Sequence, residues 1–389
     1  MTALPRRLLA SAALIALTAA QAWAFDTRAN AAFVMDQTTG TVLLAKRADE
    51  ALPPASMSKL MTLYVAFEAV RDGRLSLSEE LRVSQHAMDY GGSTLFLRAG
   101  ERVKVEDLIR GIIVLSGNDA CVVLAEALSP DGTEDGFARM MTQRAQQMGM
   151  TNSIFKNSNG WPAAGHVMSM RDLGLLARRL IEDFPEFYPM FAEQEFLFDP
   201  NESQNRFNRN PLLGLGIGAD GLKTGHTQEA GFGLVGSARQ GDRRVIFAIT
   251  GLDTAKARAE ESESIVNWAF RQFAEQTVVT KDTAIAEADI WMGAEEKVGL
   301  VAREDLTLLL PTAPVEPLKA EVVYTGPIRA PVTEGQQLAE LIIRPEGLEE
   351  TRLPLFADRA VPAAGFVDRV MTAGQHLLAR VQNRPGDAM

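Results

Sequence analysis

The stretch Ser56-Met57-Ser58-Lys59-Leu60-Met61-Thr62 guides the interpretation of the whole chain. Ser56 and Lys59 are three residues apart, which on an α-helix places both side chains on one face. Two prolines at 53 and 54 cannot continue a helix, so we expect the helix to begin close to Ser56. A serine hydroxyl becomes a nucleophile when a nearby base takes its proton, and a lysine can be that base if burial or a second cation lowers its pKa. The same spacing also occurs in an ordinary capped helix with a surface lysine.

The residues after Lys59 favour the catalytic interpretation. They are apolar on most sides of the expected helix: Leu60, Met61, Leu63, Tyr64, Val65 and Phe67. A helix that is apolar all round is buried. The ammonium of Lys59 would then be hard to solvate, so it needs a partner or a chemical role.

Composition restricts the class of protein. The chain has 389 residues, which suggests two or three domains, and 46% of them are hydrophobic, as in a globular protein. The net charge of −11 argues against nucleic acid as a partner, because a phosphate-binding face needs clustered Lys and Arg. The only cysteine, Cys121, lies in an apolar run and is expected to be a small buried hydrophobe.

The N-terminus has the pattern of an export signal. Arg6 and Arg7 precede an apolar run over 8–20, and Ala22-Trp23-Ala24 follows as a cleavage signal. The pattern predicts a signal peptide over 1–24, with cleavage after Ala24. An uncleaved N-terminal anchor is the alternative, although the run is too short to span a bilayer comfortably.

Hydrophobic periodicity predicts both strands and helices in a first domain over 25–276. A hairpin is expected over 32–46, and two further strands over 232–238 and 245–252. Helices are expected over 105–115, 120–127, 134–147, 169–182 and 260–274, with Arg258 in a charged turn before the last. Ser169 and Asp172 form a plausible capping box for the fourth of these helices.

A glycine pattern in this domain suggests nucleotide binding but lacks the right context. Gly216, Gly218 and Gly221 match G-x-G-x-x-G, yet a strand rather than a helix is expected to follow them. Lys223 and Thr224 also resemble the end of a P-loop, but the residue before Lys223 is not glycine. Neither pattern therefore predicts a nucleotide site.

The composition changes after about residue 276. Short strand-like runs interrupted by prolines predict a small β-rich domain over 277–362. The segment 363–389 is predicted to be an amphipathic helix, with Phe366, Val370, Leu377 and Val381 on one stripe. Such a helix could lie in a membrane interface or dock on the β-rich domain.

Three short motifs stand in order along the chain: Ser56-x-x-Lys59, Ser116-x-Asn118 and Lys223-Thr224-Gly225. The first falls on a helix, the second between two helices and the third on a strand. This set is typical of class A β-lactamases and penicillin-binding proteins. The 116–119 junction could also be an ordinary capping motif, since Ser, Asn and Asp are all good N-caps.

Longer stretches of the sequence restrict the resemblance to one family. The sequences at 116–121, 208–210 and 220–227 resemble those of the exported D-alanyl-D-alanine carboxypeptidases, the low-molecular-mass penicillin-binding proteins, which are serine D,D-peptidases. The likeness runs from about residue 32 to the C-terminus. It implies an α+β fold, in which a β-lactamase/D,D-peptidase-like domain, an antiparallel sheet flanked by helices, is followed by the β-rich domain and the terminal helix.

The resemblance also implies roles in acyl transfer. Ser56 would attack the D-Ala-D-Ala peptide bond, and Lys59 would take its proton while a second cation, Lys223, helps to keep Lys59 neutral. Ser116 would relay a proton to the leaving D-alanine and Asn118 would hold the substrate amide. The backbone N–H groups of Ser56 and His226 would form the oxyanion hole. The remaining substrate-binding residues are Thr224, Gly225, Arg258 and Arg209. The hydroxyl of Thr224 and the guanidinium groups of both arginines would bind the terminal carboxylate of the substrate.

The implied partners are peptidoglycan stem peptides and β-lactam antibiotics. The implied location is the periplasmic face of the bacterial inner membrane, with the C-terminal helix on the membrane surface. His86, His166, His226 and His376 form no H-E-x-x-H pattern, so no metal or other cofactor is expected. The residues do not predict the oligomeric state.

Three alternatives remain open at this point. A β-lactamase needs a base for its deacylating water, and no E-x-x-N equivalent is evident between Asn118 and Lys223. A D,D-endopeptidase that cuts cross-links would use the same residues. A wall-binding scaffold without activity is the alternative from another class, although all the motif residues are present.

Overall fold

The computed structural model describes residues 25–312, 317–345, 347–348 and 350–365. The predicted signal peptide lies outside the described residues, as does the predicted terminal helix from residue 366 onward. Within the described part, no helix is both long and apolar enough to cross a membrane. Contacts divide the chain into two units, with the boundary between Gln272 and Phe273. The boundary that the sequence predicts, after residue 276, falls inside the strand β8 (Phe273–Val279).

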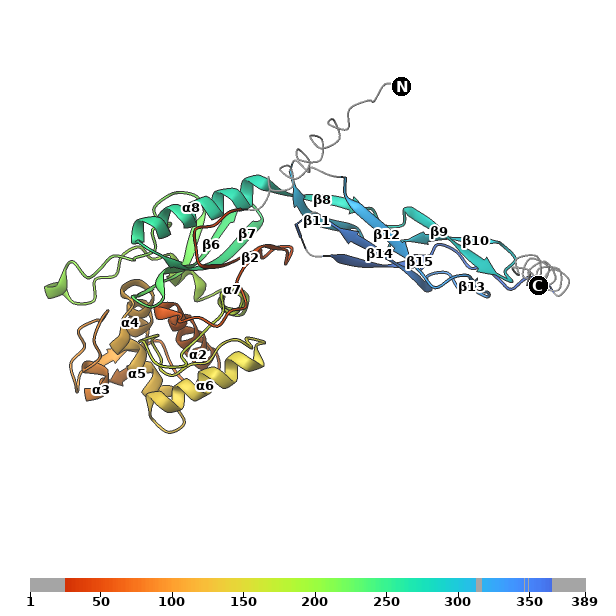
Figure 1. The fold of residues 1–389 in the computed structure, drawn as a ribbon. Coiled ribbons are helices and arrows are strands. Elements are labelled where there is room, and N and C mark those ends of the chain that lie inside the picture. The colour runs from red at the N-terminus through yellow and green to blue at the C-terminus, as the bar shows by residue number, and fades with distance from the viewer. Residues whose placement is uncertain (1–24, 313–316, 346, 349, 366–389) are drawn as a thin grey trace, which may run out of the picture. The chain divides into compact units, whose positions relative to one another are not determined.

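The first unit is built on one antiparallel sheet (Figure 1). The strand order is β2-β1-β7-β6-β5, and every neighbouring pair is antiparallel. The predicted hairpin and the two predicted strands are confirmed. The strands are β1 (Ala31–Asp36), β2 (Val42–Lys46), β5 (Ala219–Thr227), β6 (Gly231–Gln240) and β7 (Arg243–Leu252), with a small separate pair formed by β3 (Glu80–Arg82) and β4 (Arg102–Lys104).

Helices cover both faces of this sheet. Figure 1 shows α8 on one face and α2, α4, α5 and α6 beyond the other. The α-helices are α2 (Lys59–Arg71), α3 (Gln85–Met88), α4 (Val105–Arg110), α5 (Asn118–Leu128), α6 (Glu134–Gln147), α7 (Met170–Asp183) and α8 (Ala255–Gln272). Short helices of other types are also present. They are the 3₁₀ helices η2 (Ala55–Ser58), η4 (Tyr188–Ala192) and η5 (Pro200–Glu202) and the π-helix η3 (Gly111–Leu115).

Helix α2 lies in the middle of the core, as its sequence predicts. Its residues from Lys59 to Phe67 are all buried, including the aromatic rings of Tyr64 and Phe67. The helical path begins with the turn η2, directly after the two prolines, so Ser56 lies at the entrance to a buried helix. This arrangement brings a polar side chain to the edge of the core without burying it completely.

Local hydrogen bonds explain where α6 and α7 begin. The hydroxyl of Thr133 accepts a hydrogen bond from the N–H of Gly136, and that of Ser169 accepts one from the N–H of Asp172. The second of these is one half of the predicted capping box. The carboxylate of Asp172 does not complete the box, because it accepts hydrogen bonds from the N–H of Asn152 and the hydroxyl of Ser153 instead.

One local prediction is wrong. Arg258 lies inside α8 rather than in a turn before it, since the helix begins at Ala255. The hydroxyl of Thr254 accepts a hydrogen bond from the N–H of Ala257, and three alanines in the first turns favour the helix. The helix also ends earlier than predicted, because β8 starts at Phe273.

The second unit is all β in its described residues. A mixed sheet has the order β12-β14-β15-β10-β9-β13, and β11 pairs separately with β8. Its apolar core includes Val298, Leu300 and Leu355. The other strands are β9 (Ala284–Trp291), β10 (Lys297–Val301), β11 (Leu306–Pro311), β12 (Lys319–Val323), β13 (Ile328–Arg329), β14 (Gln337–Arg344) and β15 (Thr351–Ala357).

Candidate active site

The amine of Lys59 is the centre of the site. The side chain is 0% exposed, and Nζ donates to Ser56 Oγ at 2.9 Å, to Asn118 Oδ1 at 2.7 Å and to the main-chain oxygen of Asn159 at 2.5 Å. An ammonium has three protons, so the three partners satisfy it completely. Of these partners only the hydroxyl of Ser56 carries a proton. A neutral Lys59 can therefore keep two hydrogen bonds and accept the proton of Ser56.

Burial makes that neutral form accessible. The pKa of Lys59 is lowered to about 8, mainly by removal from water and in part by the positive charge of Arg209, while Asp119 opposes the shift. Burial is also the main reason why the pKa of Lys223 lies well below its usual value, and the charge of Lys59 adds to that effect. The charge of Lys59 thus opposes protonation of Lys223, whereas the cation that lowers the pKa of Lys59 is Arg209; the predicted effect of Lys223 on Lys59 stays a prediction.

The second motif lies where η3 ends and α5 begins. Ser116 is buried and has a left-handed backbone with φ of 64° and ψ of 32°. Asn118 opens α5, and its side-chain amide donates to the main-chain oxygen of Gly91 at 2.7 Å while its oxygen accepts from Lys59. Both ends of this amide thus already have protein partners.

The third motif lies on β5, the edge strand of the sheet. Nζ of the buried Lys223 donates to the main-chain oxygen of Thr224 at 3.2 Å. A Cβ at Gly225 would be only 3.0 Å from Met57 and 3.1 Å from the main-chain oxygen of Pro54, so the strand passes close to the turn that carries Ser56. The next residue, His226, is exposed and stacks on the ring of Phe232 at 3.7 Å.

The two predicted carboxylate-binding arginines are neighbours. Nη2 of Arg258 donates to the main-chain oxygen of Arg209 at 3.3 Å, and Nη1 of Arg209 donates to the hydroxyl of Ser93 at 2.5 Å. Arg258 is only 8% exposed, so it is not an ordinary surface arginine. Its Nε has no hydrogen-bond partner among the described residues. An arginine that is buried and incompletely paired is suited to an incoming anion.

A pocket of about 270 Å³ opens beside Ser56 and Asn118. Its volume is near the lower end for small-molecule sites. Trp161 is 45% exposed and forms part of the wall. The lining residues are Ser56, Gly92, Ser93, Asn118, Gly160, Trp161, Pro162, His226 and Thr227. Residues from all three regions of the sequence thus meet in one cavity.

The segment from Asn157 to Trp161 is part of the site, and the motifs did not indicate it. Asn159 takes part through its main-chain oxygen, which leaves no side-chain pattern to detect. Gly160 has φ of 83°, and a Cβ there would lie 1.9 Å from the main-chain oxygen of Ala55. Only glycine allows this segment to lie so close to the turn before Ser56. The succession Asn-Ser-Asn-Gly was the available signal for a turn.

Asp119 is the second residue that the motifs missed. Its buried carboxylate accepts hydrogen bonds from the N–H groups of Leu95 and Leu97, at 2.9 and 3.2 Å. These bonds hold the 93–97 loop against the start of α5. Ser93 of that loop lines the pocket and accepts the hydrogen bond from Arg209.

Comparison with known proteins now adds to this geometry. A family model described as D-alanyl-D-alanine carboxypeptidase matches residues 16–254. The chain belongs to this family. A second model, described as the C-terminal domain of penicillin-binding protein 5, matches residues 273–363.

Relatives support the assignment over most of the chain. The D-alanyl-D-alanine carboxypeptidase DacC of Escherichia coli is 36% identical over 88% of this chain and 86% of its own. DacF of Bacillus subtilis is 32% identical over 87% of each chain. Among solved structures, DacD of Francisella tularensis has a TM-score of 0.74 at 28% identity, covering 87% of this chain and 95% of its own. Penicillin-binding protein 5 of Haemophilus influenzae has a TM-score of 0.68 at 30% identity, covering 87% of this chain and 99% of its own.

These matches confirm the predicted family and the predicted fold, a D,D-peptidase domain followed by a β-rich domain. They also confirm the predicted class of enzyme, a serine-type D-alanyl-D-alanine carboxypeptidase. They do not test the role of any single residue, so the site residues remain predictions that the geometry described above supports.

Proposed function

We propose that this protein removes the terminal D-alanine from peptidoglycan stem peptides through an acyl-enzyme on Ser56. The contact of 2.9 Å between Ser56 Oγ and the buried amine of Lys59 carries the proposal. A base with a pKa near 8 is partly neutral at neutral pH, as an acylation base must be. The proposal thus rests on a nucleophile and a base that are already within hydrogen-bond distance.

Acylation begins when Ser56 Oγ attacks the carbonyl carbon of the D-Ala-D-Ala bond and its proton moves to Lys59. The negative charge on the carbonyl oxygen is stabilised by the N–H groups of Ser56 and His226. When the intermediate collapses, the C–N bond breaks and the leaving amine receives a proton by way of Ser116. Water then hydrolyses the ester and frees Ser56. Asn118 and Lys223 orient these groups.

Arg209 and Arg258 form a cationic side of the site that is suited to the terminal carboxylate of the substrate. Nε of Arg258 has no hydrogen-bond partner in the part of the chain that the structure describes, Arg209 lies beside Arg258, and Thr224 lies on β5. A guanidinium forms strong paired hydrogen bonds with a carboxylate. We assign the carboxylate of the last D-alanine to these three residues, which restricts the enzyme to the free end of a stem peptide.

β-Lactams would acylate the same serine. Penicillin-binding protein D2 of Listeria monocytogenes, whose structure was determined with ampicillin bound, is 32% identical and has a TM-score of 0.57, covering 64% of this chain and 99% of its own. Transfer of this property to the present chain is part of the proposal. We expect the acyl-enzyme formed by a β-lactam to be hydrolysed more slowly than the one formed by a stem peptide.

D-Alanine release from two substrates tests the proposed function. We expect the enzyme to release free D-alanine from a stem pentapeptide faster than it cleaves a cross-linked peptide dimer, because only the pentapeptide offers a free D-Ala-D-Ala carboxylate. Chromatography of the products distinguishes the two reactions. Cleavage of the dimer alone would indicate the endopeptidase, and no cleavage of either would favour the scaffold. Rapid destruction of benzylpenicillin would favour a β-lactamase.

The location of the enzyme is a separate proposal. The N-terminal pattern of arginines, apolar run and Ala-x-Ala supports export, and the amphipathic pattern after residue 365 supports attachment to the membrane surface. We expect mature protein ending at Pro362 to appear in the soluble periplasmic fraction, whereas full-length protein sediments with membranes. Immunoblots of both fractions measure this. If the shortened protein sediments as before, the terminal segment is not the anchor.

A further inference from the structure

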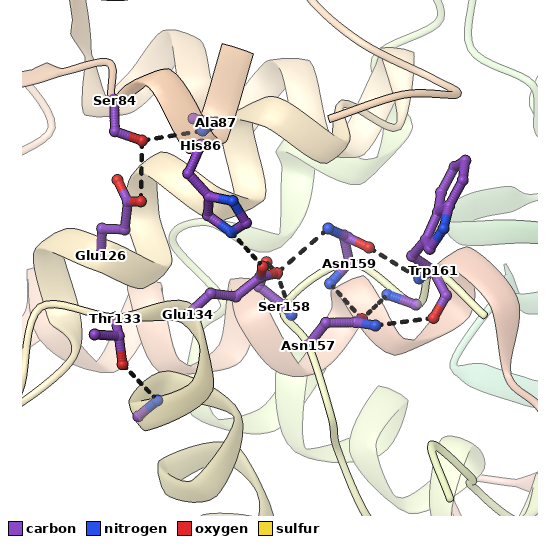
Figure 2. A network of polar contacts seen from close by, with 12 residues as sticks. Ser84, His86, Ala87, Glu126, Thr133, Glu134, Asn157, Ser158, Asn159 and Trp161 are labelled. Atoms are coloured by element: carbon purple, nitrogen blue, oxygen red, sulfur yellow. Dashed lines mark hydrogen bonds and ion pairs between the residues drawn. The ribbon is translucent and has the colours of Figure 1, made fainter. Parts of the chain in front are cut away.

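Glu134 is a buried carboxylate to which the mechanism above gives no role. It is the first residue of α6 and is 8% exposed. Its Oε1 accepts hydrogen bonds from the N–H of Ser158 at 2.9 Å, from the hydroxyl of Ser158 at 2.6 Å and from the side-chain amide of Asn159 at 3.4 Å. Figure 2 shows these contacts converging on one carboxylate. A single side chain thus holds two consecutive residues of the active-site segment.

The residues that Glu134 holds are next to the catalytic amine. The main-chain oxygen of Asn159 is one of the three partners of Lys59 Nζ. The side-chain oxygen of Asn159 accepts from the N–H of Trp161, which forms a wall of the substrate pocket. Figure 2 shows the continuous path from Glu134 through Asn159 to Trp161. A shift of this segment would therefore move both the partner of the base and the wall of the pocket.

The far oxygen of Glu134 has a different partner. Oε2 lies 3.0 Å from Nε2 of His86, whose side chain is 56% exposed. The carboxylate is therefore held from both sides and has little freedom to rotate. A carboxylate that is buried and accepts several hydrogen bonds is expensive to remove, because its partners lose their acceptor.

Glu134 also acts on Lys59 through its charge. The groups that affect the pKa of Lys59 are Asp119 and Glu134, which raise it, Arg209, which lowers it, and the thiol of Cys121. Lys223 and His166 are further basic groups whose own pKa values are lowered by the charge of Lys59. Glu134 is thus one of two carboxylates that favour the protonated form of the base.

We propose that Glu134 is a positioning residue for acylation, holding the 157–161 segment so that the main-chain oxygen of Asn159 orients the amine of Lys59 toward Ser56. This inference rests on the proposed function, since it assumes that Lys59 is the base. Glu134 acts through hydrogen bonds to Ser158 and Asn159, and it does not touch the substrate.

Two substitutions separate the hydrogen bonds from the charge. Glu134→Gln keeps an oxygen that can accept from Ser158 but removes the negative charge, whereas Glu134→Ala removes both. We expect Glu134→Ala to reduce the first-order acylation rate by benzylpenicillin at high pH by about 10- to 100-fold, because misplacing a catalytic group by an ångström has effects of this size. Glu134→Gln should stay within about threefold of the wild type on that plateau.

The pH profile gives a readout that a merely structural role would not change. In Glu134→Gln, loss of the carboxylate charge should lower the pKa of Lys59, so the midpoint of the acylation profile should move to lower pH. Rapid-mixing measurements between pH 5.5 and 10 give the acylation rate and the affinity of the preceding complex separately. We expect the affinity to change little in either variant.

Glu126→Gln is the matched control. The carboxylate of Glu126 lies in the same region and accepts a hydrogen bond from the hydroxyl of Ser84 at 2.9 Å, as Figure 2 shows. It belongs to α5 and its partner caps α3, away from the 157–161 segment. This variant should acylate at the wild-type rate with an unchanged midpoint.

The outcomes distinguish this inference from the proposed function. A plateau acylation rate for Glu134→Ala within twofold of the wild type would overturn the positioning role. The role would also be overturned if Glu134→Gln lost as much of the plateau rate as Glu134→Ala. If Glu134→Ala does not fold, Ser158→Ala provides the test: it removes the 2.6 Å bond and should reduce the plateau rate about three- to tenfold, and an unchanged rate would overturn the inference. Failure of the proposed function would look different, since the wild type itself would then not be acylated on Ser56.

Discussion

Replacement of Ser56 by alanine should abolish acylation by benzylpenicillin. Among the described residues, Ser56 is the only proton-bearing partner of the buried Lys59 amine, and it lines the substrate pocket. Removal of a catalytic nucleophile reduces the rate of covalent chemistry by at least about 10⁴-fold. Alanine lacks the oxygen but can keep the backbone of η2, so the domain should still fold. The mass of the intact protein after incubation with the drug measures the result.

Ser58→Ala is the matched control for this experiment. Ser58 belongs to the same turn, is fully buried, and its hydroxyl has no hydrogen-bond partner among the described residues. We expect the wild type and Ser58→Ala to gain one drug adduct and Ser56→Ala to gain none. An adduct on Ser56→Ala at the wild-type rate would show that another residue is the nucleophile.

Replacement of Lys59 should have the second-largest effect. Loss of a general base reduces a rate by about 10²- to 10⁴-fold, so Lys59→Ala should acylate at least about a hundredfold more slowly than the wild type. Lys59→Arg tests the chemical reason, because arginine keeps the positive charge but does not lose its proton in proteins. If Lys59 is the base, both variants are slow. An arginine variant that acylates normally would mean that the site needs a cation rather than a proton acceptor.

The pH dependence of acylation of the wild type tests, without a mutation, whether Lys59 is the base. The amine must be neutral to accept the proton of Ser56, and burial lowers its pKa to about 8. The acylation rate should therefore rise as the pH increases through 8 and then level off. Below that value it should fall by about tenfold for each pH unit, since the neutral fraction falls by that factor. A rate that does not vary between pH 6 and 9 would exclude Lys59 as the base.

Much of the fold could be predicted because local patterns and tertiary contacts agree. The helix predicted over 134–147 is α6, where acidic residues and a capping threonine mark the start. The sequence did not indicate β8, β10 or β15, because polar residues, Gly299 or Pro354 interrupt their apolar runs and such residues are depleted in strands. These strands form through pairing with their neighbours in the sheet rather than through local preference.

The site was predictable where chemistry needs a particular side chain. Ser56 and Lys59 form a recognisable motif because a nucleophile and its base act through their side chains and must lie at a fixed spacing. Asn159 could not be found in this way, because it acts through a main-chain oxygen that any residue has. The motifs did not indicate Glu134 and Asp119 for another reason. The carboxylate of each accepts hydrogen bonds from N–H groups of a loop in another part of the chain. Only the folded structure brings those parts together.

The burial of Cys121 has a practical consequence. The chain has one cysteine, its side chain is 0% exposed in α5, and burial raises the pKa of its thiol to about 12. A thiol reagent can therefore react only when the catalytic unit opens, so the labelling rate, compared with that of an unfolded chain, gives the opening equilibrium. The β-rich unit contains no thiol and makes no contribution to that signal. The protein thus carries a built-in probe with which the stability of its catalytic unit can be measured separately within the intact chain.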